Sequence, residues 1–440
     1  MEINKNSNGQ NIGLKINGYV CIYISLLIIV AFSTYFSGYN EWINAIFFIV
    51  SVATFCLVYF LRSSAFSLGV VYSFIFSLIL GIPSLYMMIK GGFEDKFYYV
   101  LVMVLLVNII LYIISPYIGR VKSNNKMLLT PLFYVVFVIS ALCQLLKIAM
   151  YLKFIIASGD GHLAIYTESA KLHQSVPSIV RLISSLSYIT SLMVFFFPSN
   201  KYSKILAVVV LSSDLLIGIR NKFFFSMLSI LILYAYQNKK LAVSIFTKIT
   251  NIRPVLIVFI VFSAISYFRE GYSINFFNYI LVVLDSLAST LSGLNKLFVV
   301  SHDTFSFIHY FDIKNIFLQL QNLVGFGGEA VQVSQTYSNL ALGTRTGGIN
   351  LSSSSVLESI LLGHEYFFII LFVYSVGVIL LISKLLSSNK IYLILIGMCM
   401  LPGLFFSTRA ELVQVFVVII KSLPIIIISP YLIREIKRSK

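Results

Sequence analysis

Arginines lie in short polar segments of a chain that is otherwise mostly apolar. The segments are Gly218–Lys222, Phe268–Gly271, Gly343–Gly348 and Ser407–Glu411, and they contain Arg220, Arg269, Arg345 and Arg409. A guanidinium binds phosphate oxygens through two parallel hydrogen bonds, a fixed geometry that Lys does not reproduce. The four arginines therefore predict a site that binds a pyrophosphate group. The alternative for each is contact with lipid headgroups, or pairing with a nearby acid such as Glu270 or Glu411.

Other ionisable residues are candidates for acid–base chemistry and for binding. Glu358 and His364 flank the expected start of a late apolar helix, where either could be a general base toward a hydroxyl group. Interfacial anchoring is the alternative. Asp214 lies inside an apolar stretch, about two turns before Arg220, and a carboxylate within a membrane helix is a functional candidate. Asp214 and Lys222 are therefore candidate binding residues, although Asp214 could simply neutralise Arg220 or Lys222.

Motifs for metals, nucleotides and disulfides are missing from the sequence. Phe368 stands where a zinc protease motif beginning at His364-Glu365 would need its second His. Gly325–Gly328 lacks the Lys-Ser/Thr pair that completes a phosphate-binding loop. The four cysteines, Cys21, Cys56, Cys143 and Cys399, lie in apolar segments without a short spacing. We therefore expect no metal, no cofactor, no nucleotide substrate and no disulfide.

The composition places these residues in a membrane protein. The chain of 440 residues is 59% apolar and 11% charged, with a mean hydropathy of +0.94. An average soluble domain is about 45–50% apolar and about 25% charged. A helix needs about 20 apolar residues to cross a hydrocarbon core of about 30 Å. The expected fold is an all-α, polytopic integral membrane protein of about twelve transmembrane helices, at 17–36, 42–61, 65–89, 97–118, 131–152, 178–197, 203–219, 222–237, 254–268, 366–386, 391–406 and 411–433.

The distribution of Lys and Arg predicts the orientation of these helices. Alternate loops and both terminal segments together contain 18 of the 32 basic residues but only Glu2 and Glu435 among the 16 acids. The whole formal charge of +16 therefore falls on one side, because the remainder of the chain is balanced. Positive charge is retained in the cytoplasm, so both termini are expected to be cytoplasmic. A charge spread over short loops does not form a nucleic-acid-binding face, and contact with membrane lipids explains it.

This topology divides the chain into three parts. Residues 1–268 form the first nine helices, 269–365 form a large loop on the outer side, and 366–440 form the last three helices and a basic tail. Within the loop, apolar residues at helical spacing between 276 and 300 predict an amphipathic helix on the outer leaflet, or alternatively a thirteenth span. From Gly325 to Ser355 the loop is polar and rich in Gly, Ser, Thr and Asn.

The layout resembles the Wzy O-antigen polymerases of Gram-negative bacteria. The similarity rests on the span number, the late outer loop, the arginine turns and the passage Gly347-Gly348-Ile349-Asn350 through Ser352–Ser355 to Glu358 and Gly363-His364-Glu365-Tyr366. The resemblance implies an inner-membrane glycosyltransferase that uses undecaprenyl-pyrophosphate-linked oligosaccharides and acts with a chain-length regulator protein. It also implies that Arg220, Arg269 and Arg409 hold the departing pyrophosphate, with Arg345 assisting and Glu358 or His364 as base.

Two rival functions stay open at this point. An O-antigen ligase would share the outer loop and the lipid donor but would pass the glycan to the lipid A core. A flippase or another transporter belongs to a different class, and alternating access commonly shows as related halves with charge near the membrane midplane. Here the halves are unrelated in sequence and most of the charge lies at the expected outer rim.

Overall fold

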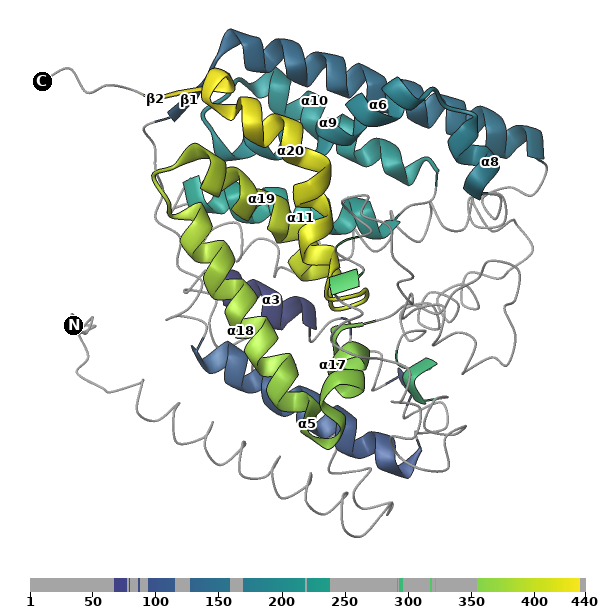
Figure 1. The fold of residues 1–440 in the computed structure, drawn as a ribbon, viewed down its shortest axis with the longest axis vertical. Helices are drawn as coiled ribbons and strands as arrows, with labels where there is room; N and C mark the ends of the chain where they lie inside the picture. The colour runs from purple at the N-terminus through teal and green to yellow at the C-terminus, as the bar shows by residue number, and fades with distance from the viewer. Residues whose placement is uncertain are drawn as a thin grey trace, which may run out of the picture.

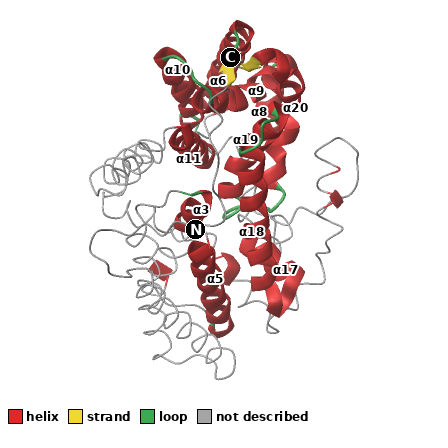
Figure 2. Cartoon of the chain, turned by 90° about the vertical axis from the view of Figure 1, so that its left-hand side faces the viewer, coloured by secondary structure: helices red, strands yellow, loops and turns green. Residues whose placement is uncertain are grey.

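Most of the residues that the structure describes lie in helices (Figure 1, Figure 2). The computed structural model describes residues 67–76, 79, 86–87, 94–114, 127–158, 169–217, 220–237, 291, 293–295, 317–318, 321 and 354–435. The helices are α3 (Leu68–Phe76), α5 (Asp95–Ile114), α6 (Pro131–Ser158), α8 (Ser169–Gln174), α9 (Ser178–Phe196), α10 (Lys201–Ser212), η3 (Ser213–Leu215, a 3-10 helix), α11 (Arg220–Gln237), α17 (Ser355–Gly363), η5 (His364–Tyr366, a 3-10 helix), α18 (Phe367–Leu386), α19 (Ile391–Phe406) and α20 (Gln414–Leu432).

Five helical segments are long and apolar enough to cross a membrane. They are Phe97–Ile114, Pro131–Ser158, Ser178–Phe196, Ser355–Leu386 and Gln414–Leu432, and Phe223–Tyr234 and Ile391–Phe406 are shorter apolar helices. On α6, Phe133 and Phe137 are buried whereas Leu142 on the opposite face is 61% exposed. A long helix that exposes so much apolar surface is stable only where lipid covers that face. The protein is therefore a membrane-embedded helical protein.

Three of the predicted helices match the structure closely, whereas others differ in their bounds. The helix predicted at 391–406 has those bounds, and α9 and α18 each differ from the prediction by one residue at one end. The helix predicted at 131–152 continues to Ser158. The one predicted at 203–219 ends at Ser212, and the Ser213 hydroxyl then donates to the Val210 carbonyl, a side-chain bond that competes with regular helix. The helices predicted at 17–36, 42–61 and 254–268 lie outside the described residues.

One end of the bundle is closed by a short two-stranded sheet. Strand β1 (Met127–Leu129) pairs antiparallel with β2 (Ile433–Glu435), with Leu128 opposite Arg434. The Thr130 hydroxyl lies 3.1 Å from the Leu432 carbonyl oxygen. The start of α6 is thereby joined to the end of α20, and we call this the β-ribbon end (Figure 1).

The opposite end gathers the turn after α19 and the start of α17. The Ser355 amide donates to the Ser407 carbonyl at 2.8 Å, and the Tyr99 hydroxyl donates to the Glu365 carbonyl at 3.3 Å. We call this the Arg409 end. Short connections join α9 to α10, α18 to α19 and α19 to α20, and in each pair the two helices pack against each other.

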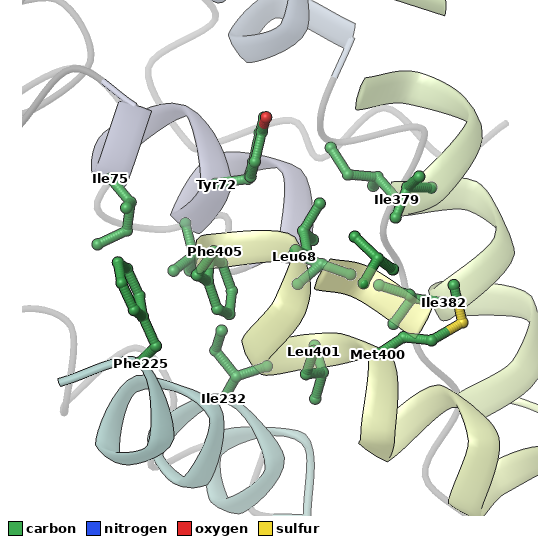
Figure 3. Packing of buried hydrophobic residues seen from close by; sticks show 14 of the residues in the cluster. Leu68, Tyr72, Ile75, Phe225, Ile232, Ile379, Ile382, Met400, Leu401 and Phe405 are labelled. Atoms are coloured by element: carbon green, nitrogen blue, oxygen red, sulfur yellow. The ribbon is translucent and has the colours of Figure 1, made fainter. Parts of the chain in front are cut away.

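Helix α19 lies at the centre of the packing. It contacts α18 and α20 and also meets α11, α9 and α3, and Figure 1 shows it between α18 and α20. Gly403 of α19 lies directly against the backbone of Gln414 and Val415 on α20. Figure 3 shows the apolar cluster built around α19 by α3, α11 and α18, with Leu68, Tyr72, Ile75, Phe225, Ile232, Ile379, Ile382, Met400, Leu401 and Phe405 labelled.

Candidate functional site at the Arg409 end

Arg409 lies in the tight turn that joins α19 to α20. The turn is built by hydrogen bonds to the last turn of α19. Ser407 donates from its hydroxyl to Leu404, Thr408 donates from its hydroxyl to Phe405, and the Arg409 amide donates to Phe406. Ser407 and Thr408 are fully buried, whereas Arg409 is partly exposed. The guanidinium is therefore carried on a rigid turn at the end of the bundle.

Helix α17 begins beside this turn. Ser354 is its N-cap, and the Ser354 hydroxyl accepts from the Leu357 amide at 3.1 Å. This cap satisfies an amide of the first turn and favours the helix start at Ser355. Glu358, in the first turn of α17, is 1% exposed, and its Oε2 accepts from the Leu412 amide at 2.9 Å.

Buried hydroxyl groups lie behind the turn. The Tyr374 hydroxyl of α18 donates to the Leu412 carbonyl at 3.1 Å, and the hydroxyls of Tyr72 and Ser375 are 3.3 Å apart. The side chains of Ser355 and Ser407 also neighbour the Tyr72 hydroxyl. Buried polar groups need hydrogen-bond partners, and the contacts of Tyr72 with Ser375 and of Tyr374 with Leu412 supply them for α3 and α18.

Helix α11 brings a second predicted arginine to the same end. The Phe225 ring packs against the Phe406 ring, with centroids 5.5 Å apart. Arg220 is the first residue of α11 and stands five positions before Phe225, and Arg409 stands three positions after Phe406. The backbones of Arg220 and Arg409 therefore approach the same end of the bundle, and Lys222 lies in the first turn of α11.

Asp214 belongs to a separate polar group inside the bundle. It lies in η3 and is 3% exposed. Its Oδ1 accepts a hydrogen bond from Gln144 Nε2 of α6 at 3.2 Å. Tyr151 and Tyr188 are close enough to interact electrostatically with this carboxylate. The sequence-predicted binding role of Asp214 stays a prediction, and Gln144 gives the carboxylate a structural partner.

His364 lies at the far end of α17 from the Arg409 turn. It is exposed, and its φ of 50° places it in the left-handed region as the residue that ends the helix. Glu358 lies six positions before it, which is about 9 Å along a helix axis. The two sequence-predicted base candidates are thus at opposite ends of one short helix.

Arg269 and Arg345 lie outside the described residues, as does most of the helix predicted between 276 and 300.

Among the described residues, no group of three or more His, Cys, Asp or Glu side chains is arranged to hold a metal ion.

No family model, curated protein or solved structure matches this chain. The chemical interpretation therefore rests on the residues themselves. A guanidinium on a rigid turn, next to a membrane-embedded bundle, can bind an anionic group of a molecule that is anchored in lipid.

Sequence reasoning did not find the residues that support the turn. Tyr72, Tyr374 and Ser375 lie in apolar segments and were not distinguished from the surrounding helices, and neither was Gln144, the partner of Asp214. A signal was nevertheless present for two of them, because Tyr374-Ser375 is a polar pair inside the expected span 366–386. Polar side chains in the middle of a membrane helix usually face protein rather than lipid.

Proposed function

We propose that the protein is a Wzy-type polymerase that extends O-antigen glycans at the periplasmic face of the bacterial inner membrane. Its substrates are two undecaprenyl-pyrophosphate-linked oligosaccharides, one carrying the growing chain and one carrying a single repeat unit. The Arg409 end faces the periplasm in this proposal, and the β-ribbon end faces the cytoplasm, where both termini are also expected. The charge distribution supports this orientation.

The reaction needs stabilisation of a leaving group. A sugar hydroxyl of the single repeat unit attacks the anomeric carbon of the growing chain. The new carbon–oxygen bond forms, the bond from that carbon to the pyrophosphate oxygen breaks, and the hydroxyl proton passes to a base. Undecaprenyl pyrophosphate departs with the bonding electrons. Guanidinium groups at Arg220, Arg269 and Arg409 would stabilise its increased negative charge without a metal.

One observation carries the proposal. The contact between Phe225 and Phe406 brings the α11 residue Arg220 and the turn residue Arg409 to one end of a membrane bundle. Two guanidinium-bearing segments at the end of membrane-spanning helices suit a pyrophosphate whose lipid tail stays in the bilayer. The large loop 269–365, with Arg269 and Arg345, would complete the site and hold the sugars.

Deletion of the gene, followed by restoration from a plasmid, tests this function. The measurement is the banding pattern of lipopolysaccharide on a gel. Core bearing one repeat unit, with a ladder that returns on complementation, is the expected result. Bare core overturns the proposal, and the lipid-linked pool then distinguishes the rivals. Accumulated polymer there identifies a ligase, and single units that are not translocated identify a flippase.

A further inference from the structure

The turn that carries Arg409 is held at both of its ends by α17. At its start, the Ser407 carbonyl accepts from the Ser355 amide at 2.8 Å. At its end, the Leu412 amide donates to Glu358 Oε2 at 2.9 Å. Ser355 and Glu358 are three positions apart and therefore lie on one face of α17. Arg409 stands between the two attachment points, so its backbone position depends on both bonds.

The same turn is also fixed from the side of α18. The Tyr374 hydroxyl donates to the Leu412 carbonyl at 3.1 Å, so both backbone polar groups of Leu412 are bonded to other helices. Glu358 is 1% exposed and Leu412 is 6% exposed. Because hydrogen bonds in a buried setting are strong and costly to lose, the position of Leu412 is closely determined.

This geometry is unlike that of a general base. A base must come within hydrogen-bond reach of the substrate proton that it removes. Glu358 is 1% exposed and one of its carboxylate oxygens accepts from a backbone amide, whereas Arg409 is partly exposed. A carboxylate that accepts from a backbone amide holds that amide in place, as an acidic N-cap residue does at the start of a helix. Glu358 holds the Leu412 amide in this way.

We propose that Glu358 is a positioning residue that sets the Arg409 turn through the Leu412 amide, and that it does not take the substrate proton. The inference rests on the proposed function in one respect only, namely that Arg409 contacts the substrate. The attachment of the turn to α17 by Glu358 is a separate statement that can be measured without any glycan.

Two substitutions of Glu358 separate the two roles. Glu358→Gln keeps a carbonyl oxygen that can accept from the Leu412 amide but removes the basic carboxylate. Glu358→Ala removes both. A positioning role predicts a polymer ladder close to wild type for Glu358→Gln and a ladder shortened to a few repeats for Glu358→Ala. A base predicts that Glu358→Gln is as inactive as Glu358→Ala, which would overturn the proposal.

A reporter in the turn gives a readout that does not depend on activity. Ala410 is 8% exposed, and an Ala410→Cys variant lacking the native cysteines can be labelled with a membrane-impermeant maleimide. We expect Glu358→Ala to accelerate labelling about tenfold and Glu358→Gln to leave the rate unchanged, at equal amounts of protein in the membrane. An unchanged rate in Glu358→Ala would show that the carboxylate does not hold the turn.

Ser355→Pro provides a second way to loosen the same turn. Proline suits the first position of a helix, and Ser354 has the extended backbone that a following proline requires (φ −154°, ψ 158°). The substitution removes the amide that bonds to Ser407. It should accelerate labelling at position 410, as Glu358→Ala does.

If the deletion phenotype contradicts the polymerase function while these labelling rates follow the prediction, the attachment of the turn to α17 stands and the polymerase function fails.

Discussion

Gln144 Nε2 donates a hydrogen bond of 3.2 Å to Asp214 Oδ1, and both side chains are at least 97% buried. The bond joins the middle of α6 to η3, the short 3-10 helix between α10 and α11. It accounts for an acidic residue within an apolar stretch, because the carboxylate has an amide partner on a neighbouring helix. It also links η3, which precedes Arg220 in the chain, with α6, the longest of the described helices.

Asp214→Ala should lower the free energy of unfolding by about 1–3 kcal/mol, because the Gln144 amide is then buried without this acceptor. Asp214→Asn should be much milder, since its amide oxygen can still accept from Gln144. Thermal denaturation of the detergent-solubilised protein measures both. If Asp214→Asn is as destabilising as Asp214→Ala, the negative charge rather than this hydrogen bond is required.

Gly403→Ala should destabilise the contact between α19 and α20. A Cβ at this position would lie 2.5 Å from the Val415 Cα and 2.5 Å from the Gln414 carbonyl oxygen. These are backbone atoms, so α20 must move, at a cost of about 1–3 kcal/mol. Ser407, at the start of the Arg409 turn, lies four positions after Gly403. A shift of α20 should therefore displace this turn and shorten the polymer ladder as well.

Gly377→Ala is the matched control for Gly403→Ala. Gly377 lies inside α18, and a Cβ there meets no atom within 4 Å. Alanine is favoured over glycine in a helix by about 1 kcal/mol, so this variant should be neutral or slightly more stable. Thermal denaturation of the two variants side by side checks the pair. Equal destabilisation would mean that helix contact is not the cause.

Arg409→Ala should abolish long polymer while the protein remains in the membrane. Removal of one electrostatic stabiliser commonly reduces turnover by about 100-fold or more. Arg409→Lys should restore little, because an ammonium cannot form the paired hydrogen bonds of a guanidinium. Arg220→Ala and Arg269→Ala should behave in the same way. The readout is the lipopolysaccharide ladder, normalised to the amount of protein in the membrane.

Arg434→Ala is the control for the arginine series. Arg434 is exposed in β2 at the β-ribbon end, so its loss should leave the ladder unchanged. Wild-type chain length in Arg220→Ala, Arg269→Ala and Arg409→Ala would refute the pyrophosphate-binding role of all three arginines.

Cysteine labelling should place the two ends of the bundle on opposite sides of the membrane. Tyr366 is 67% exposed just before α18, and Asn389 is exposed at the connection between α18 and α19. In a variant without native cysteines, Tyr366→Cys should react with an impermeant maleimide added to spheroplasts. Asn389→Cys should react only after the membrane is permeabilised. The reverse pattern would invert the proposed orientation and move the Arg409 end to the cytoplasm.

The sequence alone determined that this is a helical membrane protein and where several of its helices lie. Uninterrupted apolar segments of about 20 residues are a local property, and the charged or polar residues that flank them mark their ends. The bounds of α9, α18 and α19 could therefore be predicted closely. The Arg409 turn could also be found, because Arg409 stands out in an apolar neighbourhood.

Only the tertiary structure decided which polar residues meet. The Tyr72 and Ser375 hydroxyls are 303 positions apart in the chain, and the bond between Glu358 and Leu412 crosses 54 positions. Such contacts depend on the rotation and depth of each helix in the bundle, which its own apolar pattern does not specify when nearly every face is apolar. For the same reason α17 was not distinguished from the polar segment before it. The burial of Glu358 and the contact of α17 with the Arg409 turn exist only once that turn is packed beside the helix.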